Sequence, residues 1–446
     1  MEILLKKKWY LGFFAVLLSV LLMGTQVEAQ KKIKIGVMGP MKFTRGEHAW
    51  YGAQLAAEEI NAAGGIVVRG EKHEIELIKA DTNEFLSIPD AVSTTERLIT
   101  VDKVNFLVGG SRTEACLAQQ EVMADHKVIW GNGGGIAHPE TTIRVAKNYD
   151  HYKYWFRVHP NSIYVGKNLF AIVNMAAIKI REELGITTPR VALLMEKAKW
   201  VDPIVEAAEG SLPKMGMEVV GVWRPSPMAT DMTAELTAIK NAGAHIIFHI
   251  MSGGTNGVAI GKGWGELKIP AALIGFNTEA QHRKYWEATG NMCNYEAIFH
   301  IFGRVKLSDK TIPFFDKFVA RFKEWPEQDA ANYDVIFILK EAIERAGTLQ
   351  ADAVITEIEK TNTSGVLGRL VYYPKKDWIE VPHRAHEPKW GPGGVTFVGL
   401  QWRDGKLVGI WPDGRPVMGD AKWAGLKYEG TVDYKLPPWM IKHWKK

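Results

Sequence analysis

Lys34-Ile-Gly-Val-Met-Gly-Pro-Met41 is the stretch that decides the fold, because an apolar strand ends there on a Gly-Pro turn. The chain continues as Tyr51-Gly-Ala-Gln-Leu-Ala-Ala-Glu-Glu-Ile-Asn61, whose apolar residues repeat with a helical period and which stops at Gly64-Gly65. Residues 73–79 then form a strand pattern, and the strand end is acidic at Asp81. A strand, a helix and a second strand in this order predict a βαβ unit.

The alternation of strand and helix continues and then starts again as a second series. The first series adds helices at 87–100 and 112–125 and strands at 104–108, 127–130 and 154–158. The second series has helices at 163–183, 201–214, 232–242 and 256–265 and strands at 190–195, 217–222, 244–250 and 271–275. Two such series predict an α/β protein with two doubly wound, Rossmann-like lobes.

The last third of the chain is more mixed. Helices are expected at 313–324, 331–346 and 352–360, a strand at 367–373, and a hairpin at 395–411 around the turn Asp404-Gly405. Residues 416–446 show little periodicity, and we assign no role to them.

Composition places the chain among globular proteins, with 446 residues, 46% apolar and 24% charged. The net charge of +5 comes from scattered basic residues, so we expect no nucleic-acid partner. Residues 1–29 resemble a secretory signal: three lysines at 6–8, an apolar segment at 10–23 that is short for a membrane span, and a small-residue cleavage site before Gln30. We therefore expect export, with cleavage before Gln30. An uncleaved membrane anchor is the alternative interpretation.

The two cysteines, Cys116 and Cys293, are far apart in the sequence, and two buried free thiols are favoured over a disulfide. Motifs for catalysis are missing: there is no Gly-x-Ser-x-Gly and no P-loop. His383, His386 and Glu387 are the best metal candidates, but the prolines around them argue against a helical zinc site. We predict no enzyme, no cofactor and no metal.

Binding is better supported, because the loops after the predicted strands are polar. Ligands of open α/β sheets lie beyond the carboxyl ends of the strands. Gly109-Gly-Ser-Arg-Thr113 follows one strand and opens a helix, whose free N–H groups together with the hydroxyls of Ser111 and Thr113 suit a carboxylate. Ser111 could instead be a plain helix cap. Arg112 could pair a carboxylate bidentately or point to solvent. Ser252 follows the strand at 244–250 and could form another wall of a site.

The opening of the chain resembles type I periplasmic binding proteins, especially the Leu/Ile/Val-type receptors of ABC transporters. The resemblance rests on the strand that ends in Gly39-Pro40, on Tyr51-Gly-Ala53, on Glu58-Glu-Ile-Asn-x-x-Gly-Gly65 and on the strand that ends at Asp81. It implies a ligand cleft between two lobes joined by three crossovers near Val158, Thr278 and Gly368. Lobe 1 would hold residues 31–157 and 280–365, and lobe 2 would hold 158–279 and 366–446. It also implies a monomer in the periplasm that closes on its solute by hinge motion and delivers it to an inner-membrane permease.

The resemblance also implies site residues. The loop at 109–113 and the next one, Gly131 to Gly135, would hold the solute carboxylate, the second through Asn132, Gly133 and backbone groups. Trp50 and Tyr51 fall where the family has an aromatic residue at the cleft mouth, and Trp200 fits an aromatic residue that covers the ligand. For these three aromatic residues, packing at the start of a helix is the alternative.

The family commonly has a carboxylate near Asn277 that pairs the ammonium of an amino acid, whereas this chain has an amide there. If Glu279 or Asp202 takes over that role, the solute is a branched-chain or related hydrophobic amino acid, which is the function we expect. If neither does, the solute is an aromatic or aliphatic carboxylate, or an amide, because a buried ammonium without a counter-charge is costly. An exported sensory protein and an enzyme on the same fold are the alternatives from other classes.

Overall fold

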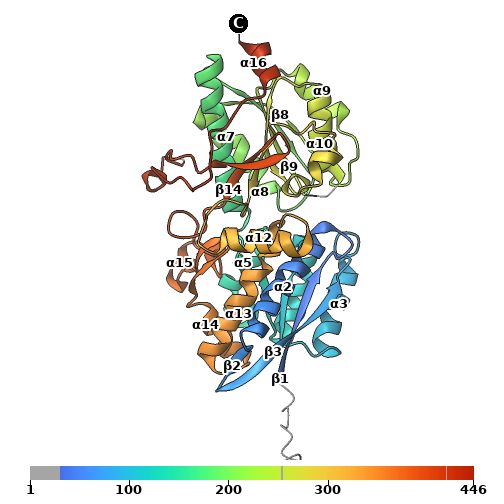
Figure 1. The fold of residues 1–446 in the computed structure, drawn as a ribbon, viewed down its shortest axis with the longest axis vertical. Helices are drawn as coiled ribbons and strands as arrows, with labels where there is room; N and C mark the ends of the chain where they lie inside the picture. The colour runs from blue at the N-terminus through green and yellow to red at the C-terminus, as the bar shows by residue number, and fades with distance from the viewer. Residues whose placement is uncertain (1–30, 253–254, 418, 446) are drawn as a thin grey trace, which may run out of the picture.

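The structure is a computed structural model that describes residues 31–252, 255–417 and 419–445. The predicted signal peptide, residues 1–29, lies outside this range. The described chain forms two α/β lobes stacked along the long axis of the molecule (Figure 1). The predicted fold class, two doubly wound lobes, is confirmed.

The first lobe is built on a six-stranded sheet in the order β2-β3-β1-β4-β5-β6. All neighbouring strands in it run parallel except β2, which pairs with β3 in antiparallel register. The strands are β1 Lys31–Gly39, β2 Ile66–Val68, β3 Glu71–Asp81, β4 Phe106–Gly109, β5 Ile129–Asn132 and β6 Trp155–Arg157. The deciding stretch is therefore the central strand of this sheet, and its Gly39 turn opens toward the other lobe.

Helices cover both faces of this sheet. On one side α3 packs against α4, and on the other α13 and α12 pack against α2. Ser87 begins α3 by accepting a hydrogen bond from the Asp90 N–H, and Pro89 is tolerated in the first turn. The helices of this lobe are α2 Thr44–Ala62, α3 Ile88–Thr100, α4 Thr113–His126, α5 Glu140–Lys147, α6 Tyr149–Tyr152, α12 Thr311–Phe322, η3 Gln328–Ala331, α13 Asn332–Ala346 and α14 Ala351–Ile358.

The second lobe has a seven-stranded sheet in the order β15-β14-β11-β10-β9-β7-β8. Its strands are β7 Arg190–Met195, β8 Glu218–Trp223, β9 Ile246–Met251, β10 Ala272–Asn277, β11 Ala297–His300, β14 Val398–Arg403 and β15 Lys406–Trp411. Every residue of β9 and β10 is buried, as expected for parallel strands covered on both faces. The helices are α7 Ser162–Leu184, α8 Asp202–Ser211, η1 Pro213–Met215, α9 Thr233–Asn241, α10 Thr255–Glu266, η2 Glu279–Gln281 and α11 Tyr285–Ala288.

One helix of the described chain, α7, is long and apolar enough to cross a membrane, and 72% of its most apolar window is buried inside the protein. It begins at the cap Asn161, whose side chain accepts a hydrogen bond from the Ile163 N–H, and it ends at Gly185 with a left-handed backbone, φ 69°. Its burial makes it a core helix of the second lobe.

The strand pairing corrects two predicted crossovers. The first crossover, predicted near Val158, joins β6 to α7. The second lies after β11 and not near Thr278, because β11 pairs with both β10 and β14 in the second sheet. The four residues of β11 follow a loop-rich stretch with no clear period, so the sequence pattern missed the strand.

The third crossover also lies later than the predicted Gly368. Residues 362–371 form a separate two-stranded hairpin of β12 Asn362–Gly365 and β13 Gly368–Val371. The following α15 Lys375–Glu380 and η4 Pro382–Arg384 stay with the first lobe, since η4 packs against α5. The chain enters the second sheet only at β14. Residues 366–397 thus lie between the predicted third crossover and β14, outside the second sheet.

The C-terminal extension, of which residues 416–417 and 419–445 are described, packs on the second lobe. The indole N–H groups of Trp439 and Trp444 donate to the carbonyls of Ile269 and Pro270. It includes η5 Ala421–Trp423 and α16 Pro438–Trp444, and α16 lies at the end of the lobe away from the first lobe (Figure 1). Cys116 and Cys293 are both free and buried, as predicted.

Candidate functional site

The carboxyl ends of strands from both lobes face each other and enclose two neighbouring cavities. The smaller cavity, which we call the inner cavity, measures about 30 Å³ and is lined by Arg45, Ser111, Thr113, Gly134, Gly135, Ile136, Ala137, His159, Val165, Trp200, Phe276 and Gln328. The outer cavity measures about 190 Å³ and is lined by Arg45, Phe85, Ser111, Arg112, Thr113, Glu114, Glu196, Lys197, Ala198, Trp200, Pro227, Met228 and Ser252. Arg45, Ser111, Thr113 and Trp200 line both, so the two cavities form one interlobe site.

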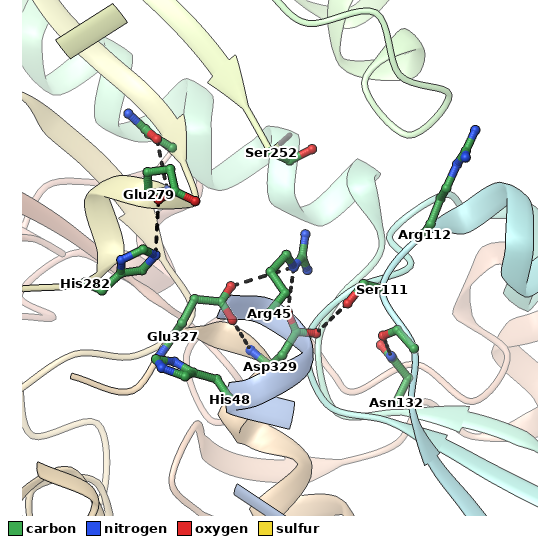
Figure 2. Close-up of polar contacts among 12 residues, drawn as sticks. Arg45, His48, Ser111, Arg112, Asn132, Ser252, Glu279, His282, Glu327 and Asp329 are labelled. Carbon is green, nitrogen blue, oxygen red and sulfur yellow. Dashed lines mark hydrogen bonds and ion pairs between the residues drawn. The ribbon is translucent and has the colours of Figure 1, made fainter. Parts of the chain in front are cut away.

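Arg45 lies at the centre of this site, in the first turn of α2 (Figure 2). Its Nε donates to Asp329 Oδ2 at 2.6 Å, and Glu327 Oε1 lies 3.9 Å from the same nitrogen. Burial alone would lower the pKa of this guanidinium, but the charges of Asp329 and Glu327 raise it. Arg45 therefore stays a cation. Its Nη2 is buried and has no hydrogen-bond partner among the described residues.

The acidic partners of Arg45 are held by η3. Glu327 begins η3 by accepting from the Asp329 N–H, and His48 Nδ1 accepts the Glu327 N–H at 2.9 Å. Burial raises the pKa of Glu327 well above its ordinary range, since desolvation outweighs the pull of Arg45. Figure 2 shows His48, Glu327 and Asp329 gathered around the start of α2.

The loop before α4 differs from the expected carboxylate site. The backbone N–H groups of Ser111 and Arg112 both donate to Glu84 Oε1, at 2.5 and 2.9 Å, and Thr82 donates its hydroxyl to Glu84 Oε2 at 2.8 Å. Burial raises the pKa of Glu84, and these hydrogen bonds act against that rise. A side chain of the protein itself thus occupies two N–H groups of this loop, those of Ser111 and Arg112.

Arg112 is held by contacts within the first lobe. Its guanidinium donates to the carbonyls of Glu84 and Phe85, both at 3.2 Å, and lies 3.4 Å from Glu114. Figure 2 shows the side chain pointing away from Arg45. Arg112 therefore lines the outer cavity while it fastens one loop to the next.

The glycine loop after β5 lies partly behind the site. Asn132 is fully buried and donates to the carbonyls of Gly109 and Gly110, so it joins two loops and lines neither cavity. A side chain at Gly133 would meet the Asn332 nitrogen at 2.3 Å, and one at Gly134 would meet the Asp329 Cα at 2.5 Å. These glycines allow η3 to pack closely on the loop, and Gly134 and Gly135 form the cavity wall.

Trp50 and Tyr51 belong to the packing of α2. Tyr51 stacks on Phe322 with 4.2 Å between ring centroids, and Lys79 lies over the Trp50 ring at 5.5 Å. Neither residue lines the two cavities, and both take part in the packing of α2.

The second lobe contributes an aromatic wall. Trp200 packs edge-on against Phe276, with 5.4 Å between centroids, and its indole N–H donates to Ser252 Oγ at 3.2 Å. The backbone N–H of Ser252 donates in turn to Glu196 Oε2 at 2.7 Å. The structure thus brings the predicted residues Trp200 and Ser252 into the interlobe site.

Glu279 and Asp202, the two candidates for pairing an ammonium, and the amide Asn277 all lie away from the inner cavity. Asn277 is buried and donates to the Gly257 carbonyl, Tyr285 Oη and Glu296 Oε1. Asp202 pairs with Arg224 at 2.7 Å. Glu279 lines a third cavity of about 360 Å³, together with His282 and Lys284, and burial raises its pKa to about 7.

The described residues contain no group of three or more His, Cys, Asp or Glu side chains placed to hold a metal ion. His386 contacts the Trp155 carbonyl and Glu359, at 2.6 and 2.9 Å, and Glu387 pairs with Arg157. His386 and Glu387 therefore have structural partners.

A family model described as periplasmic binding protein matches residues 32–378. The chain belongs to this family. Its resemblance to the branched-chain amino-acid receptors of ABC transporters, seen in the opening motifs, is confirmed.

Relatives of this periplasmic binding protein extend over nearly the whole chain. A Leu/Ile/Val-binding protein homolog 7 from Brucella abortus is 24% identical over 398 residues, which is 86% of this chain and 92% of the relative. A putative branched-chain amino acid ABC transporter from Silicibacter pomeroyi has the same fold, with a TM-score of 0.72, 18% identity and coverage of 92% of this chain and all of the other. A solute binding protein from R. palustris in complex with benzoate gives a TM-score of 0.67 at 15% identity, over 85% of this chain and 95% of the other.

Sequence analysis missed several residues of this binding protein's interlobe site, above all Arg45, Glu84, Glu327, Gln328 and Asp329. Arg45 and Glu84 carried a usable signal, because each follows a strand end of the first sheet within a few residues. The η3 residues carried no such signal, because they follow helix α12 and not a strand. They reach the site only because η3 packs against α2 in the folded protein.

Proposed function

We propose that this chain is the solute receptor of an ABC importer, that it works in the periplasm, and that it passes its solute to a permease in the inner membrane. The proposed solute is a small carboxylate with an apolar body, and a branched-chain or related hydrophobic amino acid is the first candidate. The family match and the Leu/Ile/Val-binding relatives support the receptor class. We propose a monomer, to be checked by size-exclusion chromatography.

One observation carries the carboxylate proposal: Arg45 Nη2 is buried in the wall of the interlobe site without a partner among the described residues. A solute carboxylate would pair with this nitrogen by a charge-assisted hydrogen bond. Trp200 and Phe276 would pack against the apolar part of the solute. Because the two lobes supply these groups together, hinge closure would complete the site around the solute.

A second candidate, an aromatic or aliphatic acid without an amine, is favoured by a specific feature. Among the described residues that line the inner cavity, none is Asp or Glu, and the glutamates of the site, Glu114 and Glu196, line the outer cavity. A buried ammonium without a counter-charge would cost several kcal/mol. The benzoate complex of the R. palustris protein supports the idea that this fold accepts such acids.

A thermal-shift screen of the mature chain from Gln30 tests the proposal. The panel holds leucine, isoleucine, valine and phenylalanine beside benzoate, isovalerate and their amides. A ligand at a hundred times its dissociation constant adds about 2.7 kcal/mol of stability, so a true solute gives a clear shift. Stabilisation by the amino acids supports the first candidate, and stabilisation by the amine-free acids alone supports the second. If only amides bind, or nothing does, the carboxylate proposal is wrong.

An exported sensor on the same fold is distinguished by its partners. A receptor for import is expected to be encoded beside a permease and an ATPase, and deletion of that permease should abolish uptake of the solute. Uptake that is unaffected by deletion of this receptor would contradict the importer proposal.

A further inference from the structure

Glu84 is placed as an anion would be placed at the start of a helix. The N-terminal end of a helix carries unpaired N–H groups and a partial positive charge. Here α4 begins at Thr113, and the two N–H groups just before it, of Ser111 and Arg112, converge on one oxygen of Glu84. The Glu84 side chain is fully buried. All three hydrogen bonds to its carboxylate oxygens are ones in which Glu84 accepts.

The surrounding contacts hold Glu84 in this position. Thr82 donates its hydroxyl to the second carboxylate oxygen, and Arg112 donates to the backbone carbonyls of Glu84 and Phe85. The loop after β3 and the loop after β4 are thus joined at four points. A solute carboxylate could reach these N–H groups only by displacing a buried side chain with its partners.

Arg45 offers a charged donor beside a loop in which Glu84 takes two of the N–H groups. Its Nε is used by Asp329, but its Nη2 is buried and without a partner among the described residues. Buried donors are normally paired, so this guanidinium nitrogen in the cavity wall is available to an acceptor from outside the chain.

We propose that Glu84 fills the anion site at the start of α4 as a resident carboxylate, and that the solute's own carboxylate is therefore bound by Arg45 Nη2. This inference rests on the proposed function, and it names Glu84 and Arg45 as the residues that decide where the acid group of the solute lies. Solutes are then oriented from α2 across the cavity toward Trp200.

Formate is the probe for the Glu84 half of the inference. The variant Glu84→Ala uncovers the two N–H groups, so 100 mM sodium formate should raise its unfolding midpoint by about 2 °C or more over sodium chloride at equal ionic strength. The wild type should show no such difference. Glu114→Ala is the matched control, because Glu114 lines the same outer cavity but accepts from the Arg112 side chain and not from the loop N–H groups. An equal response of both variants would overturn the inference.

Benzoate and isoleucine are the probes for the Arg45 half. Arg45→Lys keeps the charge beside Asp329 but removes Nη2, and it should weaken the probe that binds the wild type by at least tenfold. Glu84→Gln, which keeps an oxygen acceptor for the N–H groups, should bind that probe within threefold of the wild type. If Arg45→Lys leaves affinity unchanged, or Glu84→Gln loses tenfold, the assignment is wrong. If neither probe binds the wild type, the proposed carboxylate solute fails, while the formate result still decides the role of Glu84.

Discussion

Arg157 and Glu387 form an ion pair in which both side chains are fully buried, with 3.1 Å between Nε and Oε1. Arg157 is the last residue of β6, and Glu387 belongs to the segment 366–397 that precedes β14. The other oxygen of Glu387 accepts the backbone N–H of Asn161, which caps α7. The pair therefore connects the first crossover, between β6 and α7, with the segment that precedes the third crossover. Both crossovers join the two lobes, so the pair lies at the hinge.

Loss of Glu387 should destabilise the protein strongly. Glu387→Ala would leave the buried Arg157 without a counter-charge, and such losses cost about 3–5 kcal/mol of unfolding free energy. Glu387→Gln keeps an acceptor for the Asn161 N–H, so we expect a smaller loss. Urea unfolding measures both, with the exposed Glu380→Ala as the control. Equal stability of Glu387→Ala and the control would contradict the assigned role.

Trp200 should matter for solute affinity and Trp50 should not. Trp200→Ala removes the aromatic wall shared by both cavities, and the lost apolar contact should weaken solute binding by at least about tenfold. Trp50→Ala removes a ring of the same size that lines neither cavity, so affinity should change less than about threefold. Calorimetric titration with the solute found in the screen measures both. A comparable loss in the two variants would mean that Trp50 reaches the solute.

Glu279 should make stability depend on pH. Burial raises its pKa to about 7 in the folded protein, above the ordinary value of 4.5, and the nearby His282 is neutral because burial lowers its pKa to about 3. The folded state therefore binds this proton more tightly, so the stabilisation is complete below about pH 4.5 and is lost as the pH rises through 7.

The variant Glu279→Gln isolates this effect. It cannot lose a proton, so its unfolding free energy should fall less than that of the wild type between pH 5 and pH 8, by up to roughly 3 kcal/mol. Urea titrations at both pH values provide the test. Parallel pH profiles of the two proteins would show that Glu279 keeps an ordinary pKa.

The sequence predicted those parts of the site that depend on local pattern. Four predicted residues line the cavities, namely Ser111, Thr113, Trp200 and Ser252. Each follows a strand whose end could be predicted from the pattern of apolar residues. Their contact with a solute stays a prediction. The glycine loop was also located correctly, although only Gly134 and Gly135 reach the cavity wall.

The rest depends on contacts between distant segments. Arg45 meets Asp329 across 284 positions of the sequence, and no local pattern announces that pairing. Asn277 was expected to face the solute, but its side-chain amide donates a hydrogen bond to Glu296. For Tyr51 the sequence left cleft and packing open, because its stacking partner Phe322 comes from a helix late in the chain.

The C-terminal extension should stabilise the second lobe without contacting the solute. Trp439 packs on Trp264 with 5.0 Å between centroids, and its indole N–H donates to the Ile269 carbonyl at 2.9 Å. Because α16 lies at the end of the lobe away from the interlobe site (Figure 1), the two functions are separable. Trp439→Ala should lower the unfolding free energy by about 2–3 kcal/mol, somewhat less than for a fully buried tryptophan.

Affinity supplies the second measurement for this extension. Trp439→Ala should bind the solute within about twofold of the wild type, because no residue of α16 lines either cavity. Lys442→Ala, an exposed change in the same helix, is the control and should leave stability and affinity unaltered. A fall in affinity without a fall in stability would place the extension in solute binding and contradict its role as a brace of the second lobe.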